Sequence, residues 1–81
     1  MKPNLVVDAR GLFCPVPIIK TADAMRALDE GGLVEILSDD PAIELDLPAW
    51  CESNGHRIEA KHVEGKVFRY RVRKQSRDRS G

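Results

Sequence analysis

The spacing of apolar residues changes repeatedly along this chain, and these changes limit the folds that it can adopt. Residues 5–7 and 33–37 are short apolar runs of the kind that forms strands. Residues 15–29 repeat their apolar side chains at helical spacing, and so does a segment from Asp40-Pro41 to Asn54-Gly55. From residue 58 to residue 73 polar and apolar residues alternate, with a turn at residues 64–66. The predicted order is therefore βαβαββ.

Two crossovers followed by a hairpin predict an α/β two-layer sandwich with a mixed four-stranded sheet. We expect both helices to cover one face of the sheet and charged residues to occupy the other. In the second helix Ile43, Leu47 and Trp50 share one face, which should pack on the sheet with Ile36. With 81 residues, the chain fits one domain over residues 1–74 and a disordered basic tail at 75–81.

Charge and cysteine content exclude several classes of protein. Thirteen basic and thirteen acidic residues give a formal net charge of zero, which argues against direct nucleic-acid binding. The charges are unevenly placed, because residues 66–79 hold seven basic residues and one acid. Two cysteines are too few for a disulfide framework, and no apolar run approaches the ~20 residues of a membrane span. We expect a cytoplasmic protein with reduced thiols and no signal peptide.

Cys14 stands directly before Pro15 and Pro17, at the start of the first predicted helix. Proline costs little in a first helical turn, because the amides there have no partner within the helix. Cys14 is therefore predicted to be the N-cap, and the two prolines should make the start of the helix rigid. The remaining first-turn amides, of Val16 and Ile18, would favour a thiolate.

Arg10 lies four residues before Cys14 and could add electrostatic support to a nucleophilic sulfur. The alternative is that Cys14 is an inert buried thiol, as most lone cysteines are. No general base is evident, which suits sulfur transfer better than hydrolysis. His56 and His62 fall on the third predicted strand, in core or surface positions. The cysteines and histidines lack zinc-like spacing, so neither a metal nor a cofactor is expected.

Cys51 comes late in the second predicted helix, and packing is its default role. If both helices run the same way across the sheet, Cys51 lies at the opposite end of the domain from Cys14. A disulfide between them is then excluded.

Three segments of the chain resemble the TusA/SirA family of small sulfur-carrier proteins. They are Asp8-Ala9-Arg10-Gly11-Leu12-x-Cys14-Pro15-x-Pro17, Ser38-Asp39-Asp40-Pro41-Ala42 and Asp46-Leu47-Pro48-x-x-Cys51. The resemblance covers residues 5–74. It implies a βαβαββ sandwich similar to the C-terminal domain of bacterial translation initiation factor three.

The resemblance also implies that Cys14 carries sulfur as a persulfide. The sulfur would come from a cysteine desulfurase or another donor and pass to acceptor proteins, as in 2-thiolation of the wobble uridine of tRNA. Relatives of this kind also serve sulfur oxidation and molybdenum-cofactor supply. Phe13 occupies a position where polar or basic residues are common in the family, so the pathway stays open. The resemblance implies a sulfurtransferase-like carrier rather than a self-sufficient enzyme.

Two other functions remain open at this point. The first is an RNA-binding or regulatory module that uses the basic stripe Arg69, Arg71 and Arg73, although these side chains are more often a solvated face paired with Glu59. The second is a redox-sensing thiol, for which Cys51 lies too far away to act as resolving cysteine.

Overall fold

The structure, a computed structural model, describes residues 2–75, so all of the predicted tail except Gln75 lies outside the described residues. Its elements follow the predicted order: β1 (Leu5–Asp8), α1 (Val16–Arg26), β2 (Leu33–Ser38), α2 (Ile43–Asn54), β3 (Arg57–Glu64) and β4 (Val67–Arg73). None of the helices in this part of the chain is long and apolar enough to cross a membrane.

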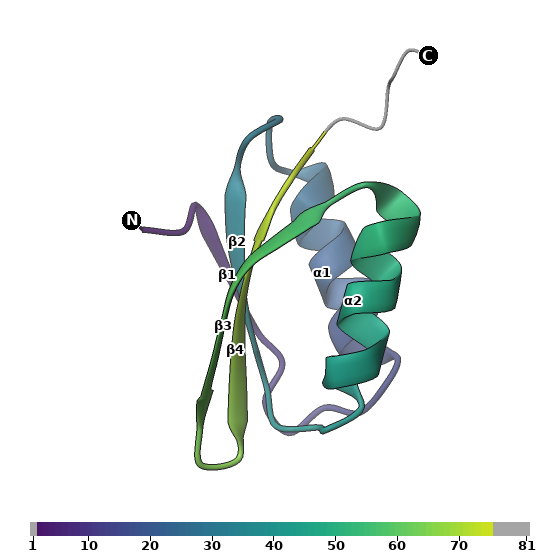
Figure 1. Cartoon of the computed structure of the whole chain (residues 1–81), viewed down its shortest axis with the longest axis vertical. Helices are drawn as coiled ribbons and strands as arrows, with labels where there is room; N and C mark the ends of the chain where they lie inside the picture. Colours follow the sequence, from purple (N-terminus) through teal and green to yellow (C-terminus); the bar gives the residue numbers. More distant parts are fainter. Residues whose placement is uncertain (1, 76–81) are drawn as a thin grey trace.

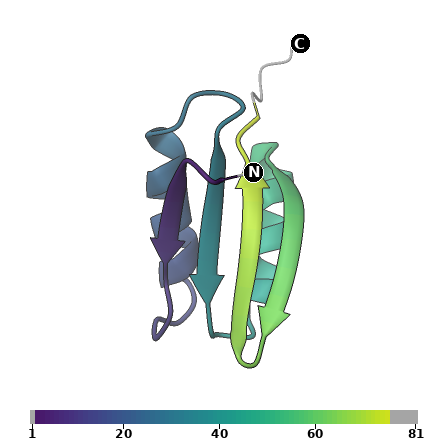
Figure 2. The same ribbon diagram turned by 90° about the vertical axis from the view of Figure 1, so that its left-hand side faces the viewer.

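The four strands form one mixed sheet in the order β1-β2-β4-β3. β1 pairs with β2 in parallel, whereas β4 pairs antiparallel with both β2 and β3. Both helices lie against one face of this sheet (Figure 1), and the other face carries no helix (Figure 2). The predicted α/β two-layer sandwich is confirmed.

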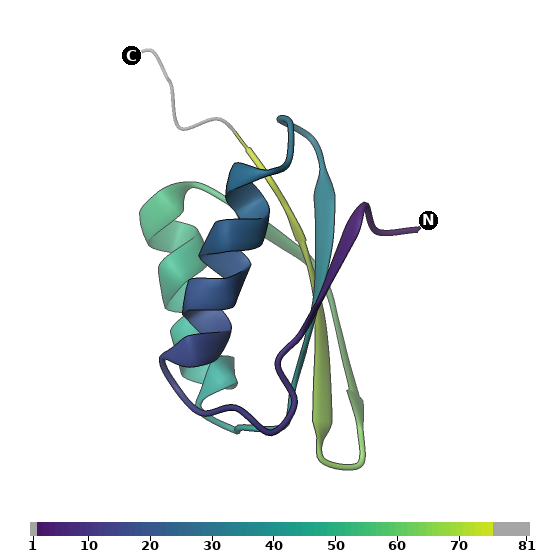
Figure 3. The same ribbon diagram turned by 180° about the vertical axis from the view of Figure 1, so that it is seen from behind.

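The helices begin at the same end of the molecule. Figure 3 shows β1 and β2 running to one end, where each turns into the helix that follows it. This arrangement follows from the parallel pairing, because the carboxyl ends of parallel strands meet at one edge of a sheet. It brings the loop of residues 9–15 beside the loop of residues 39–42.

The core lies between the helices and the sheet. Val34, Ile36 and Val72 from the two central strands and Leu47 from α2 are completely buried. The predicted packing of Ile43 and Leu47 with Ile36 is confirmed, since all three belong to one buried cluster. Trp50 is only partly buried against this cluster.

Both helices are shorter than predicted. α1 begins at Val16 and ends at Arg26, where the Lys74 ammonium donates hydrogen bonds to the carbonyls of Met25 and Leu28. Those bonds satisfy carbonyl groups that the end of a helix leaves without partners. α2 begins at Ile43 rather than at Pro41, because the first amides bond three residues back in a tighter turn.

The alternation predicted for β3 is wrong beyond Ile58. A register shift between Ile58 and Ala60 leaves Ile58 opposite Val72 but moves Lys61 opposite Tyr70. This β-bulge exchanges the two faces of the strand, so that Lys61 joins the helix-covered face and Ala60 does not. The sequence pattern alone gives no sign of the extra residue.

The packing of the core predicts the effect of shortening a single buried side chain of α2. Leu47→Ala should lower the free energy of unfolding by about 2–5 kcal/mol, because it opens a cavity in a fully buried position. Urea titration of both proteins measures this change. Leu45→Ala is the control on the same helix: its side chain is 79% exposed, and we expect a change within about 0.5 kcal/mol. Equal effects of the two substitutions would contradict this account of the core.

Candidate functional site

Cys14 is exposed and lies in the loop between β1 and α1. The N-cap of α1 is Pro15, so Cys14 stands one residue outside the position predicted for it. The Cys14–Pro15 peptide bond is cis. Pro17 is the second residue of α1 and is buried, which anchors the start of the helix against the core. The helix therefore begins one residue later than predicted, with Pro15 as its N-cap and Pro17 in its first turn.

The first-turn amides do not serve the sulfur as predicted. The Val16 amide donates to the Phe13 carbonyl at 2.9 Å, and the Ile18 amide donates to the Pro15 carbonyl at 3.1 Å. An amide that already donates to a carbonyl is not free to stabilise an anion. The partial positive charge at the start of α1 therefore acts on the thiol from outside hydrogen-bond contact, because Cys14 precedes the N-cap residue.

Two aspartates after β2 hold the cysteine loop in place. Asp40 accepts the Cys14 amide at 3.0 Å through Oδ2 and the Ala42 amide at 3.1 Å through Oδ1. Asp39 accepts the Gly11 amide with both carboxylate oxygens, at 3.0 and 3.1 Å. Amide donors favour the ionised form, so the Cys14 and Ala42 amides hold the pKa of Asp40 below its usual range.

The Cys14 sulfur faces a third aspartate. Its thiol donates a hydrogen bond to Asp46 Oδ2, with 2.6 Å between sulfur and oxygen. Asp46 lies in the first turn of α2, 32 residues further along the chain. This bond is the main reason why the pKa of Cys14 lies above its ordinary value of 9.0, with contributions from burial and from the charges of Asp46 and Asp40. The predicted activated thiolate is therefore wrong for the unloaded protein.

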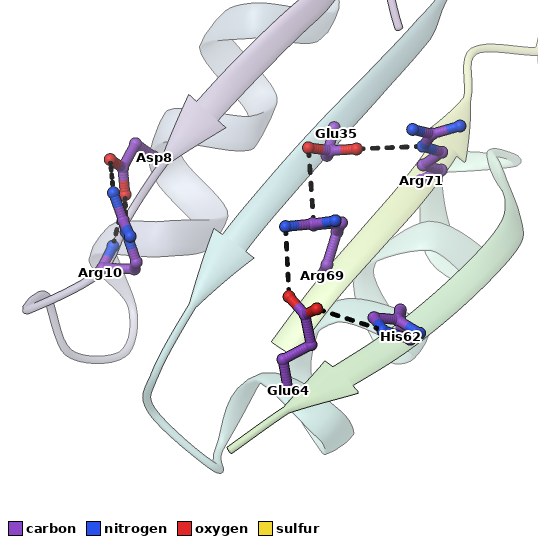
Figure 4. Close-up of polar contacts among 7 residues, drawn as sticks. All are labelled: Asp8, Arg10, Glu35, His62, Glu64, Arg69 and Arg71. Carbon is purple, nitrogen blue, oxygen red and sulfur yellow. Dashed lines mark hydrogen bonds and ion pairs between the residues drawn. The ribbon is translucent and has the colours of Figure 1, made fainter. Parts of the chain in front are cut away.

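Arg10 does not reach the sulfur. Figure 4 shows its guanidinium paired with Asp8, where Nε and Nη2 donate to the two carboxylate oxygens at 2.9 and 2.8 Å. The pair lowers the pKa of Asp8 to about 2. Arg10 therefore does not give Cys14 the predicted electrostatic support, because its Nε and Nη2 groups donate to Asp8.

The surface next to the sulfur is partly apolar. A small hollow is lined by Cys14, Pro17, Ile18, Asp40, Ile43 and Asp46. The residues that precede Cys14 and Asp46 in the chain, Phe13 and Leu45, have large apolar side chains that are 73% and 79% exposed. An exposed thiol at such a hollow can react with a group that another protein brings to it.

The other candidate residues lie elsewhere. Cys51 is buried in the core, and desolvation raises its pKa to about 11, so it is an unreactive packing residue. His56 packs its ring against Trp50 with 5.2 Å between centroids. His62 lies beside Glu64 on the open face of the sheet (Figure 4). Within residues 2–75 no three histidine, cysteine or acidic side chains converge as metal ligands.

The basic stripe on β4 is paired with carboxylates. Arg71 donates to Glu35 at 3.0 Å, and Arg69 lies between Glu35 and Glu64 (Figure 4). Arg73 pairs with Glu59 at 2.7 Å, as expected for a solvated face.

Sequence reasoning missed the three aspartates as parts of the site. Asp39, Asp40 and Asp46 contact residues 26 to 32 positions away, so no local pattern could connect them with Cys14. The available signal was their presence in the segments that carry the family resemblance. In this structure the three carboxylates accept hydrogen bonds from the cysteine loop and from the Cys14 thiol.

Comparison with known proteins gives one consistent group of relatives. The profile of the family described as "Sulfurtransferase TusA" matches residues 5–74. Sulfur carrier protein TusA of Pseudomonas syringae pv. syringae is 39% identical over 77 residues, covering 90% of this chain and 92% of that protein. Two proteins of Bacillus subtilis are named putative sulfur carriers. YrkI is 38% identical, covering 91% of this chain and 99% of YrkI. YrkF is 42% identical, and the chain spans 40% of its length.

A solved structure has the same fold. The SirA-like protein of Desulfitobacterium hafniense superposes with a TM-score of 0.77 at 26% identity. The alignment covers 89% of this chain and 99% of that one.

The acidity of Cys14 gives the first prediction for the site. Alkylation by iodoacetamide should show a pH midpoint above that of the same chain unfolded in urea, because the neutral thiol donates to Asp46. Folding therefore favours the protonated form. The stability that this contact contributes is complete below the unfolded pKa of the thiol and is lost as pH rises through the folded value. A midpoint below that of the unfolded chain would contradict the assignment.

Asp40 gives a second prediction. Asp40→Ala should speed hydrogen exchange of the Cys14 amide by about tenfold or more, because a charged acceptor is lost. Asp39→Ala is the matched control, since it should expose the Gly11 amide instead. In the unchanged protein the pKa of Asp40 is lowered, so its contribution is present above the unfolded carboxyl pKa and is lost as pH falls through the folded value. Equal protection of both amides in both variants would refute this role.

Proposed function

Because the chain belongs to the TusA family, we propose that it is a sulfur carrier that holds persulfide sulfur on Cys14. The observation that carries this proposal is an exposed cysteine, mounted by Pro15 and Pro17 and held by Asp40 at the end of a small domain. A carrier has to present its sulfur to two proteins in turn, and an exposed position in the loop between β1 and α1 permits this.

The loading step transfers one neutral sulfur atom. The Cys14 sulfur loses its proton and attacks the outer sulfur of a persulfide on the donor. A new S–S bond forms at Cys14, the S–S bond of the donor breaks, and the donor thiolate leaves and takes up a proton. No net oxidation occurs, because one persulfide is exchanged for another. The Asp46 carboxylate accepts the hydrogen bond of the resting thiol, so this bond breaks when the sulfur attacks.

The family resemblance suggests the partners. A cysteine desulfurase is the proposed donor in the cytoplasm, and a relay that leads to 2-thiolation of wobble uridine is the proposed route onward. Sulfur oxidation and molybdenum-cofactor supply are the alternative routes. Phe13 and Leu45 directly precede Cys14 and Asp46 in the chain and are exposed, so their apolar side chains are the proposed contacts for a docking partner and bear on partner choice.

The alternative of an RNA-binding module receives less support from the same structure. The side chains of Arg69, Arg71 and Arg73 each lie against a glutamate on the open face of the sheet. These pairs reduce the positive potential that binding to a phosphate backbone needs.

Loading by a cysteine desulfurase and cysteine tests the proposal. Intact mass should show one added sulfur atom on the wild-type protein and on Cys51→Ala, and none on Cys14→Ser. Cys51 is the internal control, because it is buried and its pKa of about 11 keeps it protonated. Sulfur found on Cys51 instead, or retained by Cys14→Ser, would overturn the assignment of the carrier residue.

A further inference from the structure

The contact between Cys14 and Asp46 exists for only one state of the sulfur. The thiol donates a hydrogen bond to the carboxylate, and the 2.6 Å separation of Sγ and Oδ2 leaves room between them for a proton but not for a second sulfur atom. Without that proton the two atoms would be two like charges in contact. The contact therefore reports whether the sulfur carries a proton.

Loading replaces the proton on the Cys14 sulfur with a second sulfur atom. A persulfide is more acidic than a thiol, so near neutral pH the loaded group ends in an anionic outer sulfur. Among residues 2–75, the carboxylates of Asp46 and Asp40 are the charged groups that raise the pKa of Cys14. The nearby cation, Arg10, is held by Asp8, and the Asp39 carboxylate is held by the Gly11 amide. Repulsion from Asp46 and Asp40 thus meets no balancing charge from these neighbours.

We propose that Asp46 is a positioning residue that distinguishes the empty carrier from the loaded one. In the empty protein Asp46 holds the Cys14 thiol against the first turn of α2. In the loaded protein Asp46 repels the persulfide anion and turns its outer sulfur away from α2 toward solvent. This inference rests on the proposed carrier function, because it assigns a role to Asp46 within that cycle.

The device has a direct use for a carrier. Donor and acceptor bind the same end of one small domain, and each should meet the carrier in the correct state. A donor meets a neutral thiol that it must pull from Asp46, whereas an acceptor meets a released anion ready for transfer. A cation on the donor that engages Asp46 would free the thiol and favour its ionisation.

The test compares three proteins before and after treatment with inorganic polysulfide, with intact mass to verify one added sulfur on Cys14. Asp46→Asn keeps a hydrogen-bond acceptor but removes the charge. Glu44→Gln removes a charge from the same turn of α2, at a side chain that pairs with Lys61 instead of the sulfur. The readouts are backbone amide NMR shifts of α2 and the pH profile of alkylation of the empty protein.

We expect loading to shift the amide signals of the first turn of α2 in the wild type and in Glu44→Gln, and much less in Asp46→Asn. Empty Asp46→Asn should be alkylated about three- to tenfold faster at pH 7, with an acid-shifted profile, whereas Glu44→Gln should match the wild type. A merely structural role for Asp46 would not move this profile.

Two results would overturn the inference and leave the carrier function standing. One is a wild type that gains sulfur without any change in the α2 signals. The other is an Asp46→Asn profile equal to that of Glu44→Gln. If Cys14 gained no sulfur in the wild type, the proposed function itself would fail, and the inference would fail with it.

Discussion

Because β1 and β2 pair in parallel, the chain leaves both strands at the same edge of the sheet, and each following helix must start there. This constraint places Cys14, from the first crossover, next to Asp40 and Asp46, from the second. Antiparallel pairing would have put the two loops at opposite ends. The core on the helix-covered face stabilises the pairing, and the carboxylates then fix the loop that it brings close. The geometry of the sulfur is thus a consequence of strand direction.

Two electrostatic influences compete at the sulfur, and the structure shows which one dominates. A helix start carries roughly half a positive charge, spread over amides that here already bond to carbonyls. Asp46 carries a full negative charge and touches the sulfur at 2.6 Å. The full charge in contact outweighs the partial charge at a distance, so the resting thiol stays protonated. Activation then has to come from the partner that binds, which is consistent with a carrier that should not react indiscriminately.

Much of the fold could be predicted from the sequence, because it depends on local periodicity. The strands and helices follow from the apolar spacing, and Ile43 and Leu47 pack as that spacing requires. The importance of Cys14 followed from its prolines and its motif. The acidity of its thiol could not be predicted, since Asp46 approaches from 32 residues away and only the tertiary fold brings it there. The bulge near Ile58 was missed for a related reason: it is set by pairing with β4, and no turn residue marks it.

That bulge affects how the molecule behaves among copies of itself. β3 is an edge strand, and the outer side of such a strand presents free amides and carbonyls on which another chain can add a strand. The register shift between Ile58 and Ala60 interrupts this row, and the charged residues Arg57, Glu59 and Lys61 surround the interruption. A strand from another molecule that paired with β3 would lose its hydrogen bonds near residue 59 and would meet charges of both signs. The irregularity in the ladder thus makes the β3 edge a poor template for strand addition.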